Sequence, residues 1–251
     1  MSFDRLLVLA VPALVVLSCS VKENRSACPC TLLLEMYDLP VTPVVLNVEG
    51  EGYAHTQIVH ADTVLALAVP KGVMSVSAVG GTLPDGDGCV RIPEGEQAPR
   101  LMLFHADVPT ETEQVTLPVL LRKQFCSLEL VFSGPPGFGP PFEVEVEGTV
   151  DGWFRDGRPS SGAFSFRLSP GEDGRCTVRL PRQEDDSLLM HVVFADEVIR
   201  TFALGTYIAA SGYDWSAPDL DDVTLHVDIS FTSVTLSTDL WTQTEEIELW
   251  I

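Results

Sequence analysis

The sequence predicts an all-β protein with a single short helix. Two features lead to this prediction: short segments in which apolar and polar residues alternate, and clusters of glycine and proline between them. Alternation with a period of two is the pattern of a strand with one buried face, and Gly/Pro clusters mark turns. Many short strands separated by such turns are typical of a β-sandwich or a barrel.

The clearest strand is expected at residues 143–147, where glutamates alternate with valines so that the acids would face solvent. Other segments with strand character are distributed along the whole chain. They are residues 31–36, 44–48, 64–69, 73–79, 101–104, 164–168, 176–180, 223–231, 233–237 and 246–251.

One segment, residues 204–212, has helical spacing. Leu204, Tyr207 and Ile208 would share one face of a helix of about two turns. Gly212 can adopt the left-handed conformation that commonly follows the last turn of a helix.

The chain has no long linker, and the best domain boundary lies at residues 121–124, after a polar stretch at 107–114. This predicts an N-terminal β-sandwich domain of residues 28–121 and a C-terminal β-sandwich domain of residues 122–251. Each part has a usual domain size and enough expected strands for a small sandwich. No repeat of fixed period is visible.

The N-terminus is expected to lie outside the fold. Residues 6–17 are apolar apart from Pro12, but a helix of this length spans only about 18 Å of the roughly 30 Å hydrocarbon core. That length is typical of a signal peptide. Residues 16–19 read Val-Leu-Ser-Cys and resemble a bacterial lipobox. We therefore expect a lipoprotein signal peptide at 1–18, a lipidated Cys19 and a polar tether at 19–27. The alternatives are an ordinary signal peptide with a chance cysteine, or a buried core helix.

The charge balance excludes some partners. Asp and Glu number 36 and Lys and Arg 15, which gives a net charge of −21. Binding to a nucleic-acid backbone depends on clustered Lys and Arg, so no nucleic-acid partner is expected. The same deficit of cations argues against a polybasic membrane-surface protein.

The cysteines after Cys19 are odd in number, so at least one should remain a thiol or pair with another chain. They are Cys28, Cys30, Cys89, Cys126 and Cys176. One of Cys28 and Cys30 could join Cys89, whereas Cys126 should pack as a small apolar residue. A zinc site would need a second Cys/His pair at ligand spacing, so no metal is expected.

The catalytic motifs of common enzyme classes are absent, so we expect no enzyme, no catalytic residue and no cofactor. Of the histidines, His55 and His60 would point to opposite faces of a strand, His191 would be a satisfied strand residue, and His226 would lie on a polar strand face.

Three groups of residues have both a functional and a structural interpretation. The glutamates of 143–147 are either a glycosidase pair or a solvated stripe. Residues 219–222 could offer oxygen ligands to Ca²⁺, but turn carboxylates more commonly cap backbone groups. Trp215, Trp241 and Trp250 could form a sugar-stacking platform, or fill the core and pack at edges.

Several segments together resemble a known family. Residues 19–34, CSVKENRSACPCTLLL, are similar to the mature start of Bacteroidetes lipoproteins of the FimB-like fimbrial anchor family, with Asn24 in place of the usual Asp. Residues 211–222, SGYDWSAPDLDD, resemble the last third of that family. Residues 122–125, RKQF, resemble the opening of its second domain, and Lys71-Gly72 before a strand also fits.

This resemblance implies two tandem transthyretin-like β-sandwich domains and a role in type V pili. It implies a surface lipoprotein that anchors or assembles fimbriae at the outer membrane, with the membrane and pilin subunits as partners. Pilins of this class join by strand exchange, in which backbone hydrogen bonds supply strength and alternate side chains supply register. Lys22-Glu23 also partly resembles a surface-export signal.

A mechanism of this kind has consequences for both ends of the chain. A protein lipidated at Cys19 cannot lose its N-terminal segment, so it should keep its own first strand at 31–36 and act as a fixed end. The candidate donor or contact strand is then residues 246–251, with Ile247, Leu249 and Ile251 on one face. The alternative is that this strand completes the sheet of its own domain.

Two other functions remain open from the sequence. One is a surface lipoprotein that binds glycan or another ligand through a β-sandwich. The other is a hydrolase with an unrecognised carboxylate site.

Overall fold

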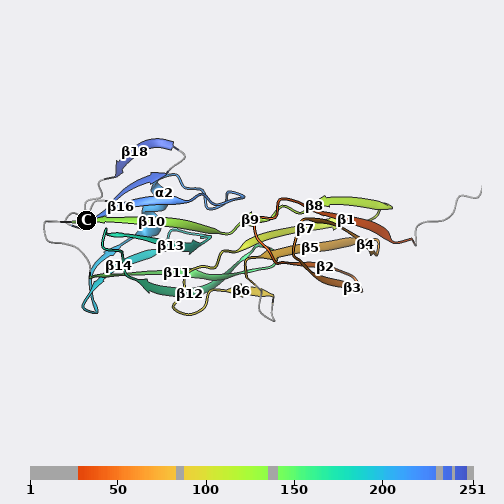
Figure 1. Ribbon diagram of the computed structural model, residues 1–251, viewed down its shortest axis with the longest axis horizontal. Coiled ribbons are helices and arrows are strands. Elements are labelled where there is room, and N and C mark those ends of the chain that lie inside the picture. Colours follow the sequence, from red (N-terminus) through yellow and green to blue (C-terminus); the bar gives the residue numbers. More distant parts are fainter. Residues whose placement is uncertain (1–27, 83–87, 135–140, 230–233, 239–240, 248–251) are drawn as a thin grey trace, which may run out of the picture.

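The computed structural model describes residues 28–82, 88–134, 141–229, 234–238 and 241–247, the last two by their backbone. The described strands form four sheets that pack in pairs into two sandwiches, arranged one after the other along the long axis of the molecule (Figure 1). The expected all-β sandwich fold is confirmed, and the described part of the chain contains one short helix.

The first sandwich consists of a sheet of order β4-β1-β8 and a sheet of order β3-β2-β5-β7-β9. Its strands are β1 (Cys30–Met36), β2 (Val44–Gly50), β3 (Tyr53–Val59), β4 (Thr63–Val69), β5 (Val73–Gly80), β7 (Met102–Pro109), β8 (Gln114–Pro118) and β9 (Arg122–Lys123).

The second sandwich consists of a sheet of order β13-β10-β16-β17-β18 and a sheet of order β12-β11-β14-β15, to which β6 adds by pairing with β11. Its elements are β6 (Cys89–Arg91), β10 (Phe125–Ser133), β11 (Glu143–Phe154), β12 (Pro159–Leu168), β13 (Arg175–Pro181), β14 (Leu189–Phe194), β15 (Glu197–Phe202), α2 (Leu204–Ala210), β16 (Val223–Asp228), β17 (Val234–Thr238) and β18 (Trp241–Ile247).

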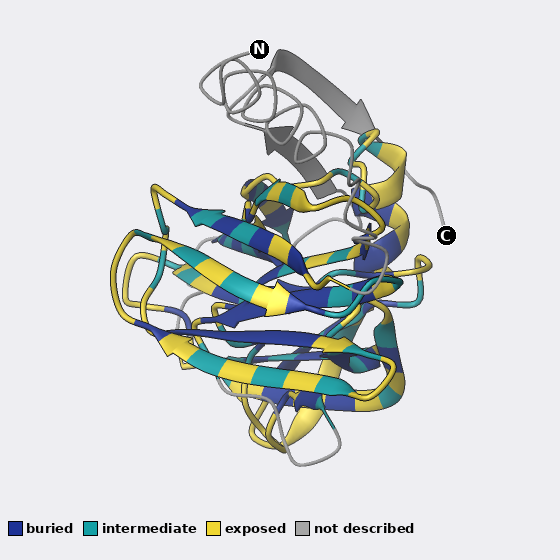
Figure 2. Ribbon diagram, turned by 90° about the vertical axis from the view of Figure 1, so that its right-hand side faces the viewer, coloured by how far each residue is buried: buried dark blue, intermediate teal, exposed yellow. Residues whose placement is uncertain are grey.

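Each sandwich has its own apolar core, because alternate residues of the strands face inward. Exposed and buried residues alternate along many strands (Figure 2). In the first core, Leu32, Leu34 and Met36 of β1 are fully buried. In the second core, Trp153 is fully buried, and the valines of 143–147 face inward as predicted.

The two sandwiches share one order of strands. The first strand of each, β1 or β10, pairs antiparallel with the fourth, β4 or β13, and parallel with a later strand, β8 or β16. The facing sheets, β3-β2-β5-β7 and β12-β11-β14-β15, also correspond strand for strand.

The correspondence between the two sandwiches extends to individual residue pairs. Leu32 pairs with Leu67 and Val115, and Leu128 pairs with Val178 and Val223. The two central strands read CTLLLEM and CSLELVF, and their first, third, fifth and seventh residues are all buried. The positions are offset by 96 residues between Leu32 and Leu128 but by 108 between Val115 and Val223, so no fixed period is visible in the sequence.

The second sandwich carries two additions to the shared strands. The helix α2 lies between β15 and β16 and buries Leu204, Tyr207 and Ile208, as predicted. Gly212 has φ +79°, which confirms its left-handed conformation after the helix. The hairpin of β17 and β18 extends the sheet beyond β16.

Among the described residues, no helix is long and apolar enough to span a membrane.

The chain passes between the two sandwiches more than once. β6 pairs with β11, and Val90, Ile92, Ala98 and Leu101 contribute to the second core. β9 pairs with β7 and leads directly into β10. The division into independent domains at residues 121–122 therefore stays a prediction.

Several strands differ from the sequence-based expectation. The strands β3, β6, β8, β9, β10 and β15 were not expected, and β7 and β11 continue well beyond residues 104 and 147. The last described strand is Trp241–Ile247, whereas a strand was expected at 246–251, and residues 248–251 lie outside the described part. Four of the unexpected strands, β3, β8, β9 and β15, lie at the end of a sheet. Edge strands and bulged strands often lack strict alternation, so a search for alternating apolar residues misses them or predicts them too short.

Candidate partner-binding site

The predicted anchor lies outside the described residues, but the strand that follows it is well placed. Cys19 is not described; Cys28 is exposed, and β1 begins at Cys30. β1 lies between β4 and β8, with hydrogen bonds to both neighbours, and its inward side chains fill the first core. The chain thus retains its own first strand as the centre of a sheet.

The predicted contact strand forms part of a sheet of its own chain. β18 pairs antiparallel with β17, and Ile247 lies opposite Val234. Leu249 and Ile251 lie outside the described residues. The pairing of β18 fits the alternative that this strand completes its own sheet, and donation by residues 246–251 stays a prediction.

Several apolar residues of β7 and β8 in the first sandwich are only partly buried. Phe104 and Ala106 of β7 and Val115 and Leu117 of β8 pack against the core but are only partly buried. Within the described residues, β8 pairs only with β1 and has no strand on its other edge.

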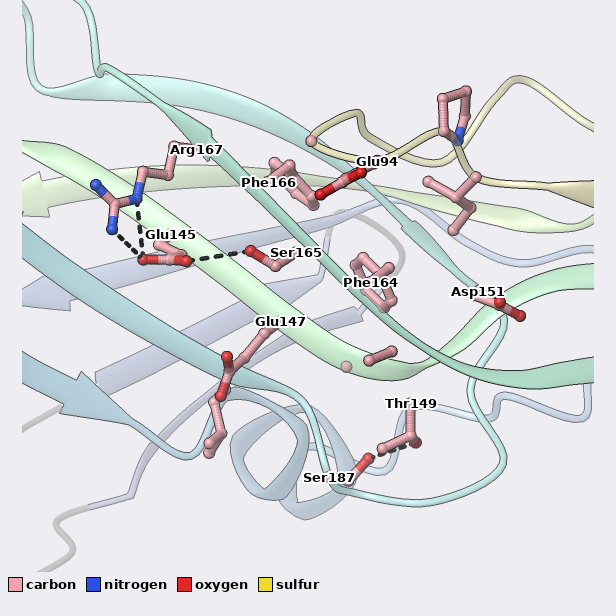
Figure 3. Close-up of a pocket in the computed structure, with 16 residues that line it drawn as sticks. Glu94, Glu145, Glu147, Thr149, Asp151, Phe164, Ser165, Phe166, Arg167 and Ser187 are labelled. Atoms are coloured by element: carbon pink, nitrogen blue, oxygen red, sulfur yellow. Dashed lines mark hydrogen bonds and ion pairs between the residues drawn. The ribbon is translucent and has the colours of Figure 1, made fainter.

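A broad trough of about 1090 Å³ lies along β11 and β12 of the second sandwich (Figure 3). Its polar lining is dominated by carboxylates and hydroxyls. Glu145 accepts hydrogen bonds from Ser165 Oγ (3.1 Å) and Arg167 Nε (3.0 Å), and the hydroxyls of Thr149 and Ser187 are 2.9 Å apart.

Two further carboxylates of the trough form no ion pair within the described part of the chain. Glu94 and Asp151 line its other end, and Asp151 Oδ1 is buried without a hydrogen-bond partner. The rings of Phe164 and Phe166 belong to the second core and are 6 % and 2 % exposed. The trough therefore offers hydrogen-bonding groups to a polar ligand but no exposed aromatic ring among these residues.

Two carboxylates of the acidic segment at 219–222 accept hydrogen bonds from the segment at 122–127. Asp219 accepts hydrogen bonds from Arg122 Nη1 (2.7 Å) and the Lys123 backbone N–H (2.9 Å). Asp222 accepts from Lys123 Nζ and from the Ser127 backbone N–H (2.7 Å). The capping interpretation of these carboxylates is correct, and the Ca²⁺ interpretation has no support from this arrangement.

These contacts affect the acidity of both carboxyls. Burial alone would raise the pKa of Asp219, but the Lys123 N–H and the Arg122 guanidinium lower it overall below the ordinary value. Burial alone would also raise the pKa of Asp222. The hydrogen bonds from the Lys123 ammonium and the Ser127 N–H outweigh this effect and lower the pKa below the ordinary value. Both side chains are thus held as carboxylates.

Arg182, which the sequence pattern did not single out, fixes the loop before β16. Its guanidinium donates to Gln124 Oε1 (3.0 Å) and to the carbonyl oxygens of Trp215 and Ala217. Burial lowers the pKa of Arg182 from its very high ordinary value, and the charges of Asp214 and Asp219 oppose this shift. Arginine is favoured at such a site because several donors share one planar group.

Trp215 packs against the second core. It is partly buried against the second core and lies edge-on to Tyr213, with ring centroids 4.7 Å apart. The core-packing alternative is therefore correct for Trp215, and the side chains of Trp241 and Trp250 are outside the described part.

The histidines occupy separate places. His191 lies in β14 with Nδ1 2.8 Å from Thr201 Oγ1, and His226 is exposed on β16, both as expected. His55 lies in β3, whereas His60 follows the end of that strand. In the described ranges, no group of three or more His, Cys, Asp or Glu is placed to hold a metal ion.

The cysteines are described from Cys28 onward. Cys28 and Cys30 are thiols, so the possible bridge from one of them to Cys89 is not formed. The reason is structural: Cys30 contributes to the first core, whereas Cys89 lies in β6, beside Phe154 of β11. Cys126 is buried in the second core as predicted.

One exposed apolar patch was not predicted. Phe194, Val198 and Ile199 at the β14–β15 turn are 51 %, 54 % and 48 % exposed. Ile199 is the extra residue of a bulge, because Val193 pairs with Val198 while Val192 pairs with Arg200. A bulge redirects side chains, which explains why two consecutive residues face solvent. Sequence alternation gives no signal for it.

The comparisons with known proteins concern the fold. No family model and no curated protein matches this sequence. The structure is similar to that of the fimbrial anchor protein Mfa2 from Porphyromonas gingivalis, with a TM-score of 0.58 and 12 % identity over 85 % of this chain and 98 % of that chain.

Two structures from Bacteroides thetaiotaomicron are similar as well. A candidate adhesin has a TM-score of 0.59 and 16 % identity, covering 88 % of this chain and 99 % of that chain. A candidate polysaccharide-binding protein has a TM-score of 0.63 and 14 % identity, covering 87 % and 98 %. At these identities the similarity shows that the chains share a fold across nearly their whole length.

Proposed function

We propose that this chain is a surface lipoprotein that is held in the outer membrane by Cys19 and anchors or assembles fimbriae through strand-mediated contact with pilin subunits. It is a binding protein and not an enzyme. The observation that carries the proposal is the central position of β1, the strand that directly follows the predicted tether.

The position of β1 suits an anchor mechanically. Hydrogen bonds between strands run roughly across the strand direction. A force that pulls on the tether acts along β1 and is shared by the bonds to β4 and β8. The fully buried Leu32, Leu34 and Met36 would have to leave the core before β1 could be withdrawn.

Two further observations support the proposal. The residues that resemble the FimB-like family are spread over nearly the whole mature chain, and one of the structurally similar proteins is a fimbrial anchor by name. The two ends of the chain also suit different tasks, because the tether precedes the first sandwich and the candidate contact strand ends the second.

The anchor is tested by replacing the cysteine that carries it. In cells with Cys19→Ala, we expect the chain and its fimbriae to be released from the outer membrane into the medium. Cys28→Ala is the matched control, since Cys28 is an exposed thiol nine positions later. Mass spectrometry of the purified chain should show acylation at Cys19. Fimbriae retained equally by both variants, or an unmodified mature end, would contradict the proposal.

The contact strand is tested by deleting residues 241–251. If the deleted chain unfolds, β18 is structural. If it stays folded, measured by circular dichroism and thermal unfolding, but no longer binds pilin subunits, then residues 246–251 supply the contact.

Glycan binding is the second candidate, and the trough along β11 and β12 favours it. A sugar could hydrogen-bond to Glu147, Asp151 and the paired hydroxyls of Thr149 and Ser187. Glycan-array binding that is lost with Asp151→Asn and kept with Asp196→Asn would favour this function. Pilin subunits that co-purify with the native chain would favour the first.

A further inference from the structure

The tip of the β11–β12 hairpin reaches the outer face of the first sandwich. Arg155 Nη1 lies 3.7 Å from Glu49 Oε1 of β2, and a pocket of about 290 Å³ lies between the hairpin and the sheet. The sheet contributes Ser75 and Ser77 of β5 and His105 of β7 to its lining. The pocket is therefore built from both sandwiches.

The face of the sheet at this pocket is polar but buried. Leu46 of β2 and Val76 of β5 belong to the first core, so the residues next to them in these strands point outward. Two of these outward residues, Asn47 and Ser77, are nevertheless only 3 % and 7 % exposed. They lie opposite each other in the register of β2 and β5, and Ser77 lies opposite His105. A polar row thus crosses three strands at the contact between the sandwiches.

This polar row differs from the neighbouring part of the same contact. Val79 of β5 and Leu103 of β7 also point outward, and both belong to the second core. Apolar burial stabilises that part of the contact, whereas buried polar groups cost free energy unless they are hydrogen-bonded. Packing alone therefore does not explain the polar row.

Two nitrogen donors in this region have no acceptor among the described residues. Arg155 Nε and Asn47 Nδ2 are both buried without a hydrogen-bond partner. The Thr56 hydroxyl donates to Asn47 Oδ1, which leaves the amide nitrogen unused. The 3.7 Å between Arg155 Nη1 and Glu49 is too long for a hydrogen bond. Because buried donors are nearly always satisfied in folded proteins, the pocket lacks an acceptor.

The charges around the pocket define this acceptor. A guanidinium can only donate, and two of its N–H groups match the two oxygens of a carboxylate. Glu49 balances Arg155, and Asp156 balances Arg158, whose Nε donates to it at 2.6 Å. Among the described lining residues, only His105 can add a further positive charge. A singly charged carboxylate fits this balance better than a doubly charged phosphate.

The other lining groups and the size of the pocket define the remainder of the ligand. The hydroxyls of Ser75 and Ser77 can donate or accept, and Glu49 can accept from a ligand hydroxyl. A volume of about 290 Å³ is at the lower end for ligand sites, which suits one small molecule.

We propose that this pocket binds a small hydroxylated carboxylic acid, such as a sugar acid. Its carboxylate accepts hydrogen bonds from Arg155 Nε and the Ser77 hydroxyl, and its hydroxyls bond to Ser75 and Glu49. The ligand thereby joins the hairpin of the second sandwich to the sheet of the first. The pocket shares no lining residue with the trough along β11 and β12, and the inference does not depend on fimbrial anchoring.

Glucuronate is the probe, with glucose as the control that lacks the carboxylate and inorganic phosphate as the control for charge. Calorimetry measures binding to the full mature chain, and NMR follows the Nε–H signals of its arginines. We expect glucuronate to bind with a Kd of about 1 mM or lower and to shift the Arg155 Nε–H signal. Neither control should bind comparably.

Arg155→Lys tests the donor, because lysine keeps the positive charge but lacks Nε and the planar group. It also assigns the Arg155 signal by its absence. The matched control is Arg175→Lys, since Arg175 forms a similar pair with Glu129 at 2.9 Å between β13 and β10. We expect glucuronate to bind Arg155→Lys at least about tenfold more weakly and Arg175→Lys as it binds the unaltered chain.

Thermal unfolding shows whether Arg155→Lys is folded. If it is not, Ser77→Ala replaces it, because this variant removes only a hydroxyl from the pocket. We expect Ser77→Ala to bind glucuronate about fivefold more weakly than the unaltered chain, and equal binding would contradict the site.

The possible failures are distinguishable. A chain that does not bind glucuronate, or that binds it equally well with Arg155→Lys, overturns the site. Binding that is lost with Asp151→Asn but kept with Arg155→Lys places the ligand in the trough and also overturns it. Equal binding of phosphate or of glucose overturns the choice of a carboxylate. None of these results bears on fimbrial anchoring, which Cys19→Ala tests separately.

Discussion

Arg122 and Asp219, which lie 97 residues apart in the chain, form an ion pair of 2.7 Å. This contact joins the segment that leads into β10 to the loop that leads into β16. Two of the segments that resemble the fimbrial anchor family, residues 122–125 and 211–222, are therefore in direct contact. Their short motifs have a structural role: they hold the junction between the sandwiches.

Removing the carboxylate of Asp222 should weaken this junction. Asp222→Asn loses the ion pair with Lys123 and weakens the bond from the Ser127 N–H. We expect a loss of about 1 kcal/mol in the free energy of unfolding, since the side chain is more than half exposed and solvent screens the pair. Unfolding in urea measures this loss of stability.

Asp221→Asn is the matched control for this experiment. Its backbone carbonyl accepts from Tyr213, but this bond does not depend on the side chain. Equal stability of the two variants would show that the Asp222 carboxylate does not secure the loop.

The same carboxylates should make the free energy of unfolding depend on pH in acid solution. The folded pKa values of Asp219 and Asp222 lie below the ordinary 3.8. Their contribution is therefore present above pH 3.8 and is lost as the pH falls through the lower folded values. The stability difference between the unaltered chain and Asp222→Asn should be constant near neutral pH and shrink below pH 3.8. A difference that grows on acidification would contradict this.

Arg182→Ala should be more damaging than loss of an exposed arginine. It leaves the carbonyl oxygens of Trp215 and Ala217 and the Gln124 amide without their donor. Unsatisfied buried groups cost about 1–3 kcal/mol, so we expect a loss of about 2 kcal/mol and faster proteolysis of the loop at 213–222.

The control is Arg158→Ala, which removes an arginine that is 73 % exposed and pairs with Asp156. We expect a change within about 0.5 kcal/mol for this surface substitution. A similar loss in both variants would indicate a general charge effect instead of a specific role for Arg182.

Two adjacent leucines test the role of β1 in the first core. Leu34 is fully buried, whereas Leu33 lies on the outer face of the sheet and is partly exposed. Leu34→Ala should cost about 3 kcal/mol because it leaves a cavity, and Leu33→Ala less than about 1 kcal/mol. If thermal unfolding shows equal losses, then β1 does not occupy the centre of the core.

The thiols should differ in reactivity. Burial raises the pKa of Cys126 to about 11 and that of Cys176 to about 12. Both are therefore protonated at pH 8, and the thiolate is the reactive form. With a thiol reagent at pH 8, mass spectrometry should show modification of the exposed Cys28 first. Cys126 and Cys176 should react at the same rate as Cys28 only after denaturation.

The sequence by itself determined the all-β fold, the short helix at Leu204–Ala210 and most inward-facing residues. These follow from local rules: period-two alternation on strands, helical spacing of Leu204, Tyr207 and Ile208, and glycine after the helix. The glutamates of 143–147 behave as predicted because the burial of the intervening valines fixes which side chains face water.

Only the tertiary structure decided which distant segments meet. The repeated strand order is invisible in the sequence because loops of different length change the offset from 96 to 108 residues. The pairing of β6 with β11, the contacts of Arg182 and the open edge of β8 depend on long-range pairing and on which strand ends a sheet. Periodicity reports which face of a segment is buried, but not what lies against it, so these features require the assembled fold.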